Sequence, residues 1–500
     1  FMLSDQLRTK KLILEFLIWK NEYWRILSVT IGRHPNTWPI CRAYVKPKAL
    51  DLFAGPGGLS LGLTLSGFNV VGAIEWDHQA GRTYRHNIGE HVHIGDIREL
   101  PPKEMEMRLK RSGHISSKSE ISLISGGPPC PGFSLVGRSK IANLIKSGEW
   151  EGTDSRHSFI DDPRNHLFKE FVSYVRHFKP KRILMENVMG MTSYKDKNER
   201  PIISVIKHEF EEAGYKVSAK VLDASDFGVP QARKRVIFLG SRGKRQAVSY
   251  PGEVGFKIPS RHAIRDLPTV NLLTGTQESD KLSPLRWRGN SGKFLKWIRE
   301  SGTPSGILPM RSTSTLHKTR PVNPRDRAIF PLINSGEKGT RTLYKDIFPN
   351  RLDEVKELLP SGYSLVEESD KKWVTGPSWG TRKDSRWGWY DPSKFGDKMR
   401  RIRGDLPAPT IVAHLAKDGY MFIHPDEDRT ITVREAARLQ SFPDAFDFSA
   451  DGANPTSSQF RQVGNAVPPL LAMALGSEII KSLGLKPKMT VSEIFDRQRI

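Results

Sequence analysis

The chain has 500 residues, of which 37% are hydrophobic and 27% are charged, and its formal net charge is +23. These proportions are those of an ordinary soluble globular protein. The length exceeds the size at which one hydrophobic core stops growing, so we expect two domains. No window approaches 18 uninterrupted apolar residues, which argues against a membrane span. The excess of cations favours a polyanionic partner over a merely well-solvated basic surface.

Cysteine and histidine usage argues against disulfide and metal sites. The two cysteines, Cys41 and Cys130, are too few for a cysteine-rich zinc site and do not suggest a structural disulfide, as in a reducing cytoplasm. The 14 histidines show no HExxH or similar spacing, so we predict no metal cofactor. Residues 1–45 are interpreted as an N-terminal extension that begins with an amphipathic helix rather than a signal peptide.

The first predicted elements flank a glycine-rich turn. Within KALDLFAGPGGLSLG, residues 50–53 predict a short buried strand, and a helix begins near Leu59. The glycines between them allow the backbone to approach a ligand closely and leave amide groups free to bind it. A dinucleotide-binding turn would carry a third glycine where this chain has Ser60, so a nicotinamide dehydrogenase is only a distant alternative.

Acidic and aromatic residues follow the next two strands. The second strand starts near Val70 and ends at Glu75, about 20 positions past the glycine turn, where a carboxylate can accept both ribose hydroxyls of a nucleoside. Trp76 can lie flat on adenine, and Asp96, after a third strand, can accept the adenine amino group. The alternatives are a solvated strand-end glutamate and a core tryptophan.

The stretch ISLISGGPPCPGFS, residues 121–134, is the most informative. Its β-branched apolar run predicts a buried strand, and the glycines and prolines after it form a stiff turn that presents Cys130. Open α/β sheets bind their ligands at this carboxyl edge, although a buried, inert thiol is the alternative. Residues 135–160, rich in Gly, Ser and charge, predict a long mobile loop suited to act as a lid.

Three more charged residues are candidates for the same sheet edge. A strand at 182–185 ends in Glu186, which is therefore expected on the side where Cys130 lies. Arg233 and Arg235 alternate along an extended segment and so share one side, where two guanidinium groups suit a phosphate or the carbonyl edge of a base. A helix-capping or solvated glutamate and surface arginines are the alternatives.

Residues 241–400 lack the alternation of strands and helices and are rich in Gly, Pro, Ser and cations. Cations interleaved with flat aromatic rings suit contacts with phosphates and with bases or sugars, so the segment predicts a nucleic-acid surface. It holds six of the 11 tryptophans: Trp287, Trp297, Trp373, Trp379, Trp387 and Trp389. A short helix at 433–440 and a helix opened by Pro468 and Pro469 follow.

Taken together, these residues resemble the DNA (cytosine-5) methyltransferase family of the prokaryotic restriction-modification or phage-defence type. The resemblance runs from about Lys48 to Leu485 and rests on the ordered set DLFAGPGGLSLG, AIEWD, GDI, GGPPCPGFS, DPRNHLF, MENV, QARKR, REAARLQSFPD and GNAVPP. It implies an α/β, Rossmann-like S-adenosylmethionine-dependent methyltransferase domain with a mostly parallel sheet, one reversed strand and helices on both faces. We expect this catalytic domain at 46–245, completed by 455–485, and a smaller target-recognition domain with its return segment at 246–454.

The resemblance also implies roles for single residues. Cys130 matches the nucleophile, and Glu186 matches the carboxyl group that contacts the base. Arg233 and Arg235 match the arginines that support the activated base. The positions that match contacts to the methyl donor are Phe53, Gly55, Gly57, Glu75, Trp76, Asp96, Ile97 and Asn465. Pro131 departs from the family, which often has Gln after the cysteine, so any role of that Gln must fall to another residue.

The implied reaction transfers a methyl group from S-adenosylmethionine to carbon 5 of a flipped-out cytosine in a specific duplex DNA sequence, with S-adenosylhomocysteine as product. A thiolate that adds to carbon 6 gives carbon 5 the electron density to attack the methyl group. A tRNA cytosine-5 methyltransferase and a catalytically silent DNA-binding protein of the same fold are the rival functions.

The expected partner is duplex DNA and not a membrane, and a cognate restriction endonuclease or other defence-system proteins are candidate partners. The expected location is the prokaryotic cytoplasm, in association with the nucleoid. The sequence does not predict the recognition site.

Overall fold

The structure, a computed structural model, describes residues 46–129, 167–195, 199–243, 245–284, 288–310, 312–337, 339–368, 371–378, 386–389 and 398–496. Cys130, Pro131, the predicted loop at 135–160 and the extension at 1–45 lie outside the described residues.

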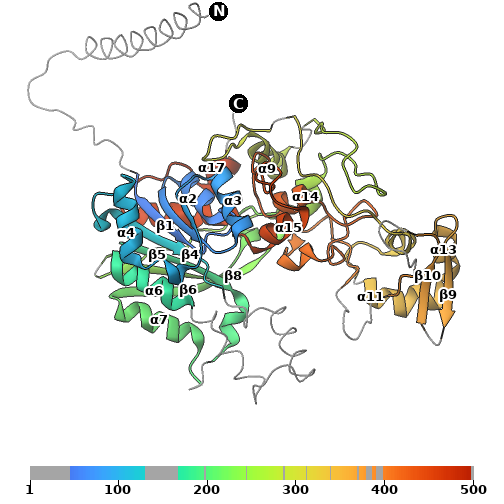
Figure 1. Cartoon of the computed structure of the whole chain (residues 1–500), viewed down its shortest axis with the longest axis horizontal. Coiled ribbons are helices and arrows are strands. Elements are labelled where there is room, and N and C mark those ends of the chain that lie inside the picture. Colours follow the sequence, from blue (N-terminus) through green and yellow to red (C-terminus); the bar gives the residue numbers. More distant parts are fainter. Residues whose placement is uncertain are drawn as a thin grey trace, which may run out of the picture. The chain divides into compact units, whose positions relative to one another are not determined.

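The described residues form a seven-stranded sheet with the order β3-β2-β1-β4-β5-β8-β6 (Figure 1). Strands β3, β2, β1, β4 and β5 pair in parallel, whereas β8 is antiparallel to both β5 and β6. The prediction of a mostly parallel sheet with one reversed strand is confirmed. The strands are β1 (Lys48–Leu52), β2 (Asn69–Glu75), β3 (Val92–Ile94), β4 (Ile121–Gly126), β5 (Arg182–Val188), β6 (Tyr215–Asp223) and β8 (Lys234–Arg242).

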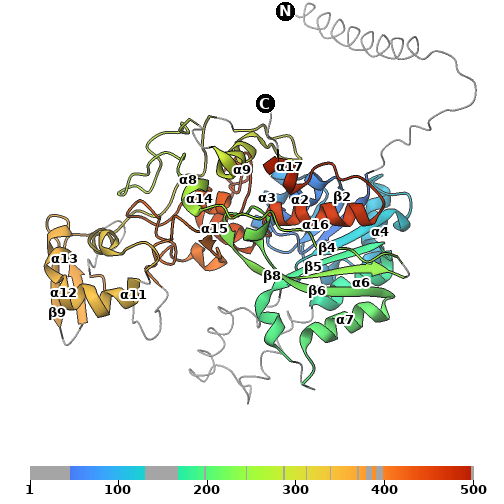
Figure 2. The same cartoon turned by 180° about the vertical axis from the view of Figure 1, so that it is seen from behind.

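Helices cover both faces of this sheet, as the view from behind shows (Figure 2). The inner strands are therefore buried on both sides, which explains why they are near-continuous apolar runs rather than alternating ones. One face packs against α2 (Gly58–Ser66), α3 (His78–Asn87) and α16 (Pro469–Ser482). The other packs against α4 (Pro102–Arg111), α6 (Leu167–Phe178) and α7 (Ile202–Glu212).

Helix α16 joins the core from the far end of the sequence. It packs so closely on α2 that a Cβ atom at Gly62 would lie 2.4 Å from the Cβ atom of Ala472, so only glycine fits there. Within the described residues, the helical stretch Thr456–Ser482 is long and apolar enough to cross a membrane, and 83% of its apolar window is buried inside the structure. A buried core helix passes the same test.

Short helices and two small sheets occupy most of the region between β8 and α16. The helices are α8 (Ser260–Ile264), α9 (Gly289–Glu300), α10 (Pro324–Ile329), α11 (Gly339–Thr342), α12 (Phe348–Asn350), α13 (Leu352–Leu358), α14 (Val433–Leu439) and α15 (Thr456–Asn465), and α17 (Val491–Asp496) follows α16. The small sheets pair β9 (Ser364–Glu368) with β10 (Lys371–Thr375), and β7 (Gln231–Ala232) with β11 (Ala408–Pro409).

This region contributes to two hydrophobic cores. Phe294, Leu295 and Ile298 of α9 belong to the same core as α2 and α16, whereas residues such as Phe330 and Leu343 form a separate cluster. Two of the six tryptophans are buried, which corrects the expectation of a nucleic-acid surface for those two rings.

These two are Trp297 and Trp387, whose exposed fractions are only 8% and 6%. Their rings are used for packing and are not available to stack on a base. Trp373 and Trp389 are half-buried, and each has an arginine guanidinium over its ring, from Arg386 and Arg325. Trp287 and Trp379 lie outside the described residues.

The order of the strands defines where a ligand can bind. The chain passes from β1 outward to β2 and β3, and then returns to β4 on the other side of β1 before it continues to β5. Connections that leave two neighbouring strands in opposite directions open a crevice at the carboxyl ends of those strands. Here that crevice lies where β1 and β4 end.

Candidate active site

The backbone of the turn after β1 has a conformation that lets a ligand come close to it. Phe53 has a φ of 59°, which is strained for a residue with a side chain, and Gly55 and Gly57 have φ values of 57° and 105°. A Cβ atom at Gly57 would lie 2.7 Å from Cγ1 of Ile88, so this position must be glycine. A Cβ atom at Gly55 would meet no atom within 4 Å, which leaves open space beside the backbone of the turn.

Glu75 at the end of β2 is bound to this turn. Its Oε2 accepts the Gly55 N–H at 2.7 Å, and its Oε1 accepts the Asp77 N–H at 2.8 Å. Burial, and to a smaller extent the neighbouring carboxylates of Asp77 and Asp51, raise the pKa of Glu75 to about 7, against the lowering effect of its two backbone hydrogen bonds. Each carboxylate oxygen still has a lone pair for another donor. Trp76, the next residue, is 74% exposed.

Asp96 follows β3 and already binds Arg98. It accepts the Arg98 N–H at 2.9 Å and pairs with the Arg98 guanidinium at 2.6 Å. The Arg98 side chain lowers the pKa of Asp96, which therefore stays an ionised acceptor. Ile97 between them is 4% exposed. The end of β3 is thus followed by an ionised carboxylate and a buried apolar side chain.

The segment that follows Asn465 reaches the start of α2 from the C-terminal part of the chain. Asn465 is the last residue of α15 and is exposed. Two residues later, the Val467 carbonyl lies where a Cβ atom on Gly58 would be only 2.2 Å away. The structure therefore brings the glycine turn, Glu75 and the segment after Asn465 to one place.

The described part of the loop after β4 ends at Pro129, one residue before Cys130. A Cβ atom at Gly127 would lie 3.1 Å from Oε2 of Glu186. The Asn187 amide donates from Nδ2 to the Pro128 carbonyl at 3.0 Å, and its Oδ1 accepts the Val188 N–H at 2.8 Å. These contacts hold the start of the loop against β5.

Glu186 forms an ion pair with Arg235. Nε of Arg235 lies 2.9 Å from Oε1 of Glu186, and both side chains are only 13% exposed. Glu186 is not at the end of its strand, as the sequence suggested, because β5 extends to Val188 through its pairing with β8. That pairing places Arg235 opposite Val188, two residues from Glu186.

Arg233 is used differently from Arg235. It is 2% exposed, and its Nη1 donates to the Ile411 carbonyl at 3.0 Å and to the Gly464 carbonyl at 3.1 Å. Burial lowers the pKa of Arg233, and the charge of Arg235 acts in the same direction. Of the two predicted arginines, Arg235 therefore contacts Glu186, whereas Arg233, directly before β8, binds the backbone at Ile411 and near the end of α15.

Sequence reasoning missed two buried polar residues at the site. One is Asn187. The other is Asp51 in β1, which is fully buried and accepts hydrogen bonds from the Ser60 hydroxyl at 2.6 Å and the Ser125 hydroxyl at 3.2 Å. Burial raises the pKa of Asp51 to about 6. A charged residue within an otherwise apolar strand was the available signal.

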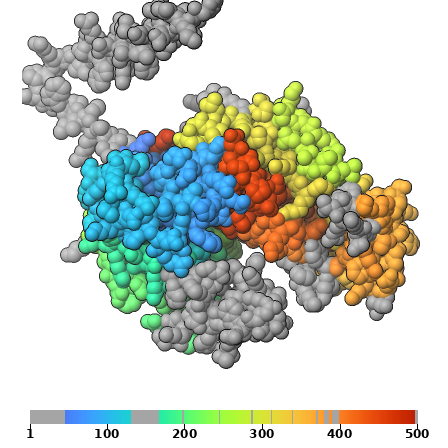
Figure 3. Space-filling view, viewed as in Figure 1, coloured from blue at the N-terminus to red at the C-terminus, as the bar shows by residue number. Residues whose placement is uncertain are grey.

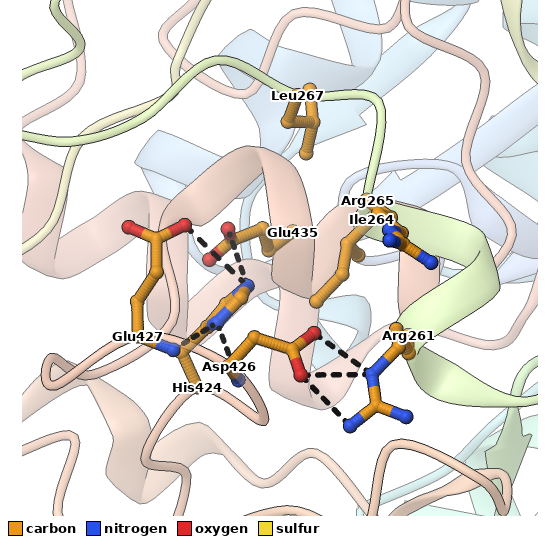
Figure 4. A pocket seen from close by; sticks show the side chains of 8 residues that line it. All are labelled: Arg261, Ile264, Arg265, Leu267, His424, Asp426, Glu427 and Glu435. Atoms are coloured by element: carbon orange, nitrogen blue, oxygen red, sulfur yellow. Dashed lines mark hydrogen bonds and ion pairs between the residues drawn. The ribbon is translucent and has the colours of Figure 1, made fainter. Parts of the chain in front are cut away.

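A pocket of about 480 Å³ lies among α8, α14 and residues 424–427, and none of the predicted site residues lines it (Figure 4). Its carboxylates already have cationic partners: Arg261 pairs with Asp426 at 2.8 Å, and Arg429 pairs with Glu427 and Glu435. Because these charges are compensated internally, we interpret the pocket as structural. No group of three or more His, Cys, Asp and Glu residues within the described ranges could hold a metal ion.

The residues at the crevice fit a nucleoside-containing cofactor. Open space beside Gly55 gives room, the Glu75 carboxylate offers lone pairs for ribose hydroxyls, and the exposed Trp76 ring offers a flat apolar face. The Asp96 carboxylate adds an acceptor for an exocyclic amine.

The chain is similar to known DNA methyltransferases. The family described as C-5 cytosine-specific DNA methylase matches residues 48–481. A type II methyltransferase, M.DdeI from Desulfomicrobium norvegicum, is 33% identical over 86% of this chain and 88% of its own length. M.AgeI from Thalassovita gelatinovora is 29% identical over 86% of this chain and 99% of its own length. A crystal structure from an E. coli prophage, a candidate DNA modification methyltransferase, covers 87% of this chain and 99% of that one, with a TM-score of 0.56 and 22% identity, and so shares the fold.

Proposed function

This chain belongs to the C-5 cytosine-specific DNA methylase family, and on that premise we propose that Cys130, Glu186 and Arg235 form its catalytic centre. The enzyme is a DNA (cytosine-5) methyltransferase of the type II restriction-modification kind and depends on S-adenosylmethionine. The roles of the individual side chains are the part that we propose.

The single observation that carries the proposal is the contact between Asn187 and Pro128. Cys130 follows Pro128 by two residues, and two residues span at most about 7 Å. Asn187 neighbours Glu186, whose carboxylate pairs with Arg235. A base that enters the crevice beside Glu186 therefore lies within reach of the Cys130 thiol.

We assign covalent catalysis to Cys130. Carbon 5 of cytosine is a poor nucleophile because attack through it disrupts a stable ring. A thiolate that forms a bond to carbon 6 leaves an enamine-like ring whose carbon 5 can attack a methyl group. Water then takes up the carbon 5 proton, and the electrons of that bond restore the double bond between carbons 5 and 6 and expel the Cys130 thiolate.

Glu186 and Arg235 stabilise the charge that this addition creates. Electron density moves onto ring nitrogen 3, where a carboxyl group can share or donate a proton. The Arg235 guanidinium orients that carboxyl group and adds positive charge in a site that is largely closed to water. Arg233 does not contact the base in this assignment. Its Nη1 donates to the Gly464 carbonyl and so fixes the backbone directly before Asn465.

The methyl donor would occupy the crevice between the glycine turn and the C-terminal segment. Bound S-adenosylmethionine supplies an electrophilic methyl group. Glu75 would accept the ribose hydroxyls, Trp76 would cover one face of the adenine, Asp96 would accept its amino group, and Ile97 would pack beside it. The backbone at Phe53, Gly55 and Gly57 leaves space for the group, and Asn465 would close the site. The chemistry that we assign requires no metal.

The domain organisation follows from the same assignment. Residues 46–245 and 455–485 form the catalytic domain, and 246–454 form the target-recognition domain and its return segment. Duplex DNA binds between them with the target cytosine flipped out, because the base cannot react within the stack. The enzyme acts in the cytoplasm together with a cognate restriction endonuclease.

Trapping with 5-fluorocytosine tests the assignment directly. Fluorine at carbon 5 cannot leave as a proton does, so the enzyme stays bound to the methylated ring through sulfur. Mixed-sequence duplex DNA with this base should give a covalent complex that survives denaturation and depends on S-adenosylmethionine. The complex should be absent with Cys130→Ser. A complex that persists in this variant would show that Cys130 is not the nucleophile.

A further inference from the structure

Helix α15 contacts the start of α3 through an arginine for which no family role was expected. Nη2 of Arg461 lies 2.8 Å from Oδ2 of Asp77 and donates to Oε1 of Gln79 at 2.9 Å. Asp77 caps α3, since its Oδ1 accepts the N–H groups of Gln79 and Ala80. Arg461 therefore binds the one oxygen of Asp77 that the cap does not use.

Asp77 is in turn linked to the proposed cofactor site. Its backbone N–H donates to Oε1 of Glu75, while Oε2 of Glu75 accepts from Gly55. A continuous series of contacts thus runs from α15 through Asp77 and Glu75 to the glycine turn.

The segment around α15 is firmly attached to α3, so the position of Arg461 is well defined. The Asn454 amide donates to the Gln79 carbonyl and to the Thr83 hydroxyl, and the Asn87 side chain bonds to the backbone of Asp447. The space-filling view shows the C-terminal part (red) directly beside residues 48–100 (blue) (Figure 3).

We propose that Arg461 is a positioning residue for the methyl-donor site: it fixes Asp77 and, through it, the orientation of the Glu75 carboxylate that receives the ribose. The inference rests on the proposed role of Glu75. It makes the affinity for the cofactor depend on the C-terminal segment that also carries Asn465.

The charges near Glu75 predict a change in the pH dependence of cofactor binding that a purely structural arginine would not cause. The carboxylates of Asp77 and Asp51 face Glu75, and both raise its pKa. Arg461 compensates the charge of Asp77. Its removal should therefore raise the pKa of Glu75 above about 7, whereas removal of the Asp77 charge should lower it. Ribose hydroxyls favour the ionised carboxylate, so binding should strengthen as pH rises through this pKa.

The test measures the dissociation constant of S-adenosylhomocysteine by titration calorimetry at pH 6 to 9 with the full chain. Arg461→Gln should weaken binding about fivefold near pH 7, the upper range for a partly exposed ion pair, and should move the midpoint of the pH profile upward. Arg461→Lys should restore most of the affinity. Asp77→Asn, which keeps an oxygen for the cap, should move the midpoint downward.

Arg85→Gln is the matched control, because Arg85 pairs with Glu90 on the same helix region and makes no contact with the Glu75 series. It should leave affinity and profile unchanged. Unchanged affinity and midpoint in both Arg461→Gln and Asp77→Asn, while Glu75→Gln weakens binding, would overturn the inference. Failure of the wild type to bind, or wild-type affinity in Glu75→Gln, would instead overturn the proposed role of Glu75. Should Arg461→Gln not fold, the midpoint of Asp77→Asn decides.

Discussion

The guanidinium of Arg235 lies 2.9 Å from the carboxylate of Glu186, and both side chains are nearly closed to solvent. This pair lies where the reversed strand β8 pairs with β5, directly beside the start of the loop that leads to Cys130. An ion pair of this kind orients a carboxyl group without leaving its charge uncompensated.

Glu186→Gln should slow methyl transfer more than it weakens cofactor binding. The amide keeps the shape of the side chain but cannot share a proton with ring nitrogen 3, and general acid-base catalysis contributes about 10² to 10⁴-fold. Single-turnover rates should fall by a factor in this range while the dissociation constant of S-adenosylhomocysteine changes little. Equal losses in rate and in cofactor affinity would mark Glu186 as a structural residue.

Asn187→Ala should reduce the rate without changing the chemistry. The variant loses the hydrogen bond to Pro128, so the loop start is no longer fixed beside Glu186. A misplacement of about 1 Å costs about 10²-fold in rate, and the same factor is expected for trapping by 5-fluorocytosine. The control is Asn69→Ala, which removes an exposed side chain at the start of β2, at the opposite edge of the sheet, and should leave the trapping rate unchanged. A wild-type trapping rate in Asn187→Ala would show that Pro128 does not need this bond.

Two glycines of the same turn should respond differently to alanine. Gly57→Ala places a Cβ atom 2.7 Å from Ile88, so the melting temperature should fall markedly. Gly55→Ala meets no neighbouring atom and costs only the strain of a positive φ, about 1–2 kcal/mol. It fills the space assigned to the cofactor, so its affinity for S-adenosylhomocysteine should fall more than its stability. Full affinity in Gly55→Ala would place the cofactor elsewhere.

Asp51 should make the protein less stable as pH rises. Burial raises its pKa from 3.8 to about 6, so the neutral carboxyl group is favoured in the folded state. The stability that this provides is fully present below about pH 4 and is lost as pH rises to about 6. The melting temperature of the wild type relative to Asp51→Asn should therefore fall over this range and level off above it. A difference that does not change with pH would contradict the assigned cause.

Periodicity and turn chemistry predicted most of the sheet. The strands that end at Leu52 and Gly126 appear where apolar runs approach glycines, and the strand that ends at Glu75 appears where an apolar run meets acidic residues. Each was recognisable because a strand buried on both faces leaves a continuous apolar signal. The glycine turn was recognisable for another reason, because positions with positive φ tolerate few residues other than glycine.

Arg233 binds backbone carbonyl groups and Arg235 pairs with Glu186, and this difference was not predictable from their alternation along the chain. It depends on Ile411 and Gly464, which are far away in sequence and offer the carbonyl groups that Arg233 binds. The burial of Trp297 is similar, because a basic, aromatic segment looks the same whether its rings pack inward or face a ligand. Local composition carries no information on these long-range contacts.

The most direct test of the account is methyl transfer from labelled S-adenosylmethionine to mixed-sequence duplex DNA and to tRNA, followed by mapping of 5-methylcytosine at single-base resolution. The wild type should label one short recurring DNA sequence, and Cys130→Ser should bind the same DNA but transfer no label. Label in tRNA alone, or transfer by Cys130→Ser at a rate near that of the wild type, would contradict the account.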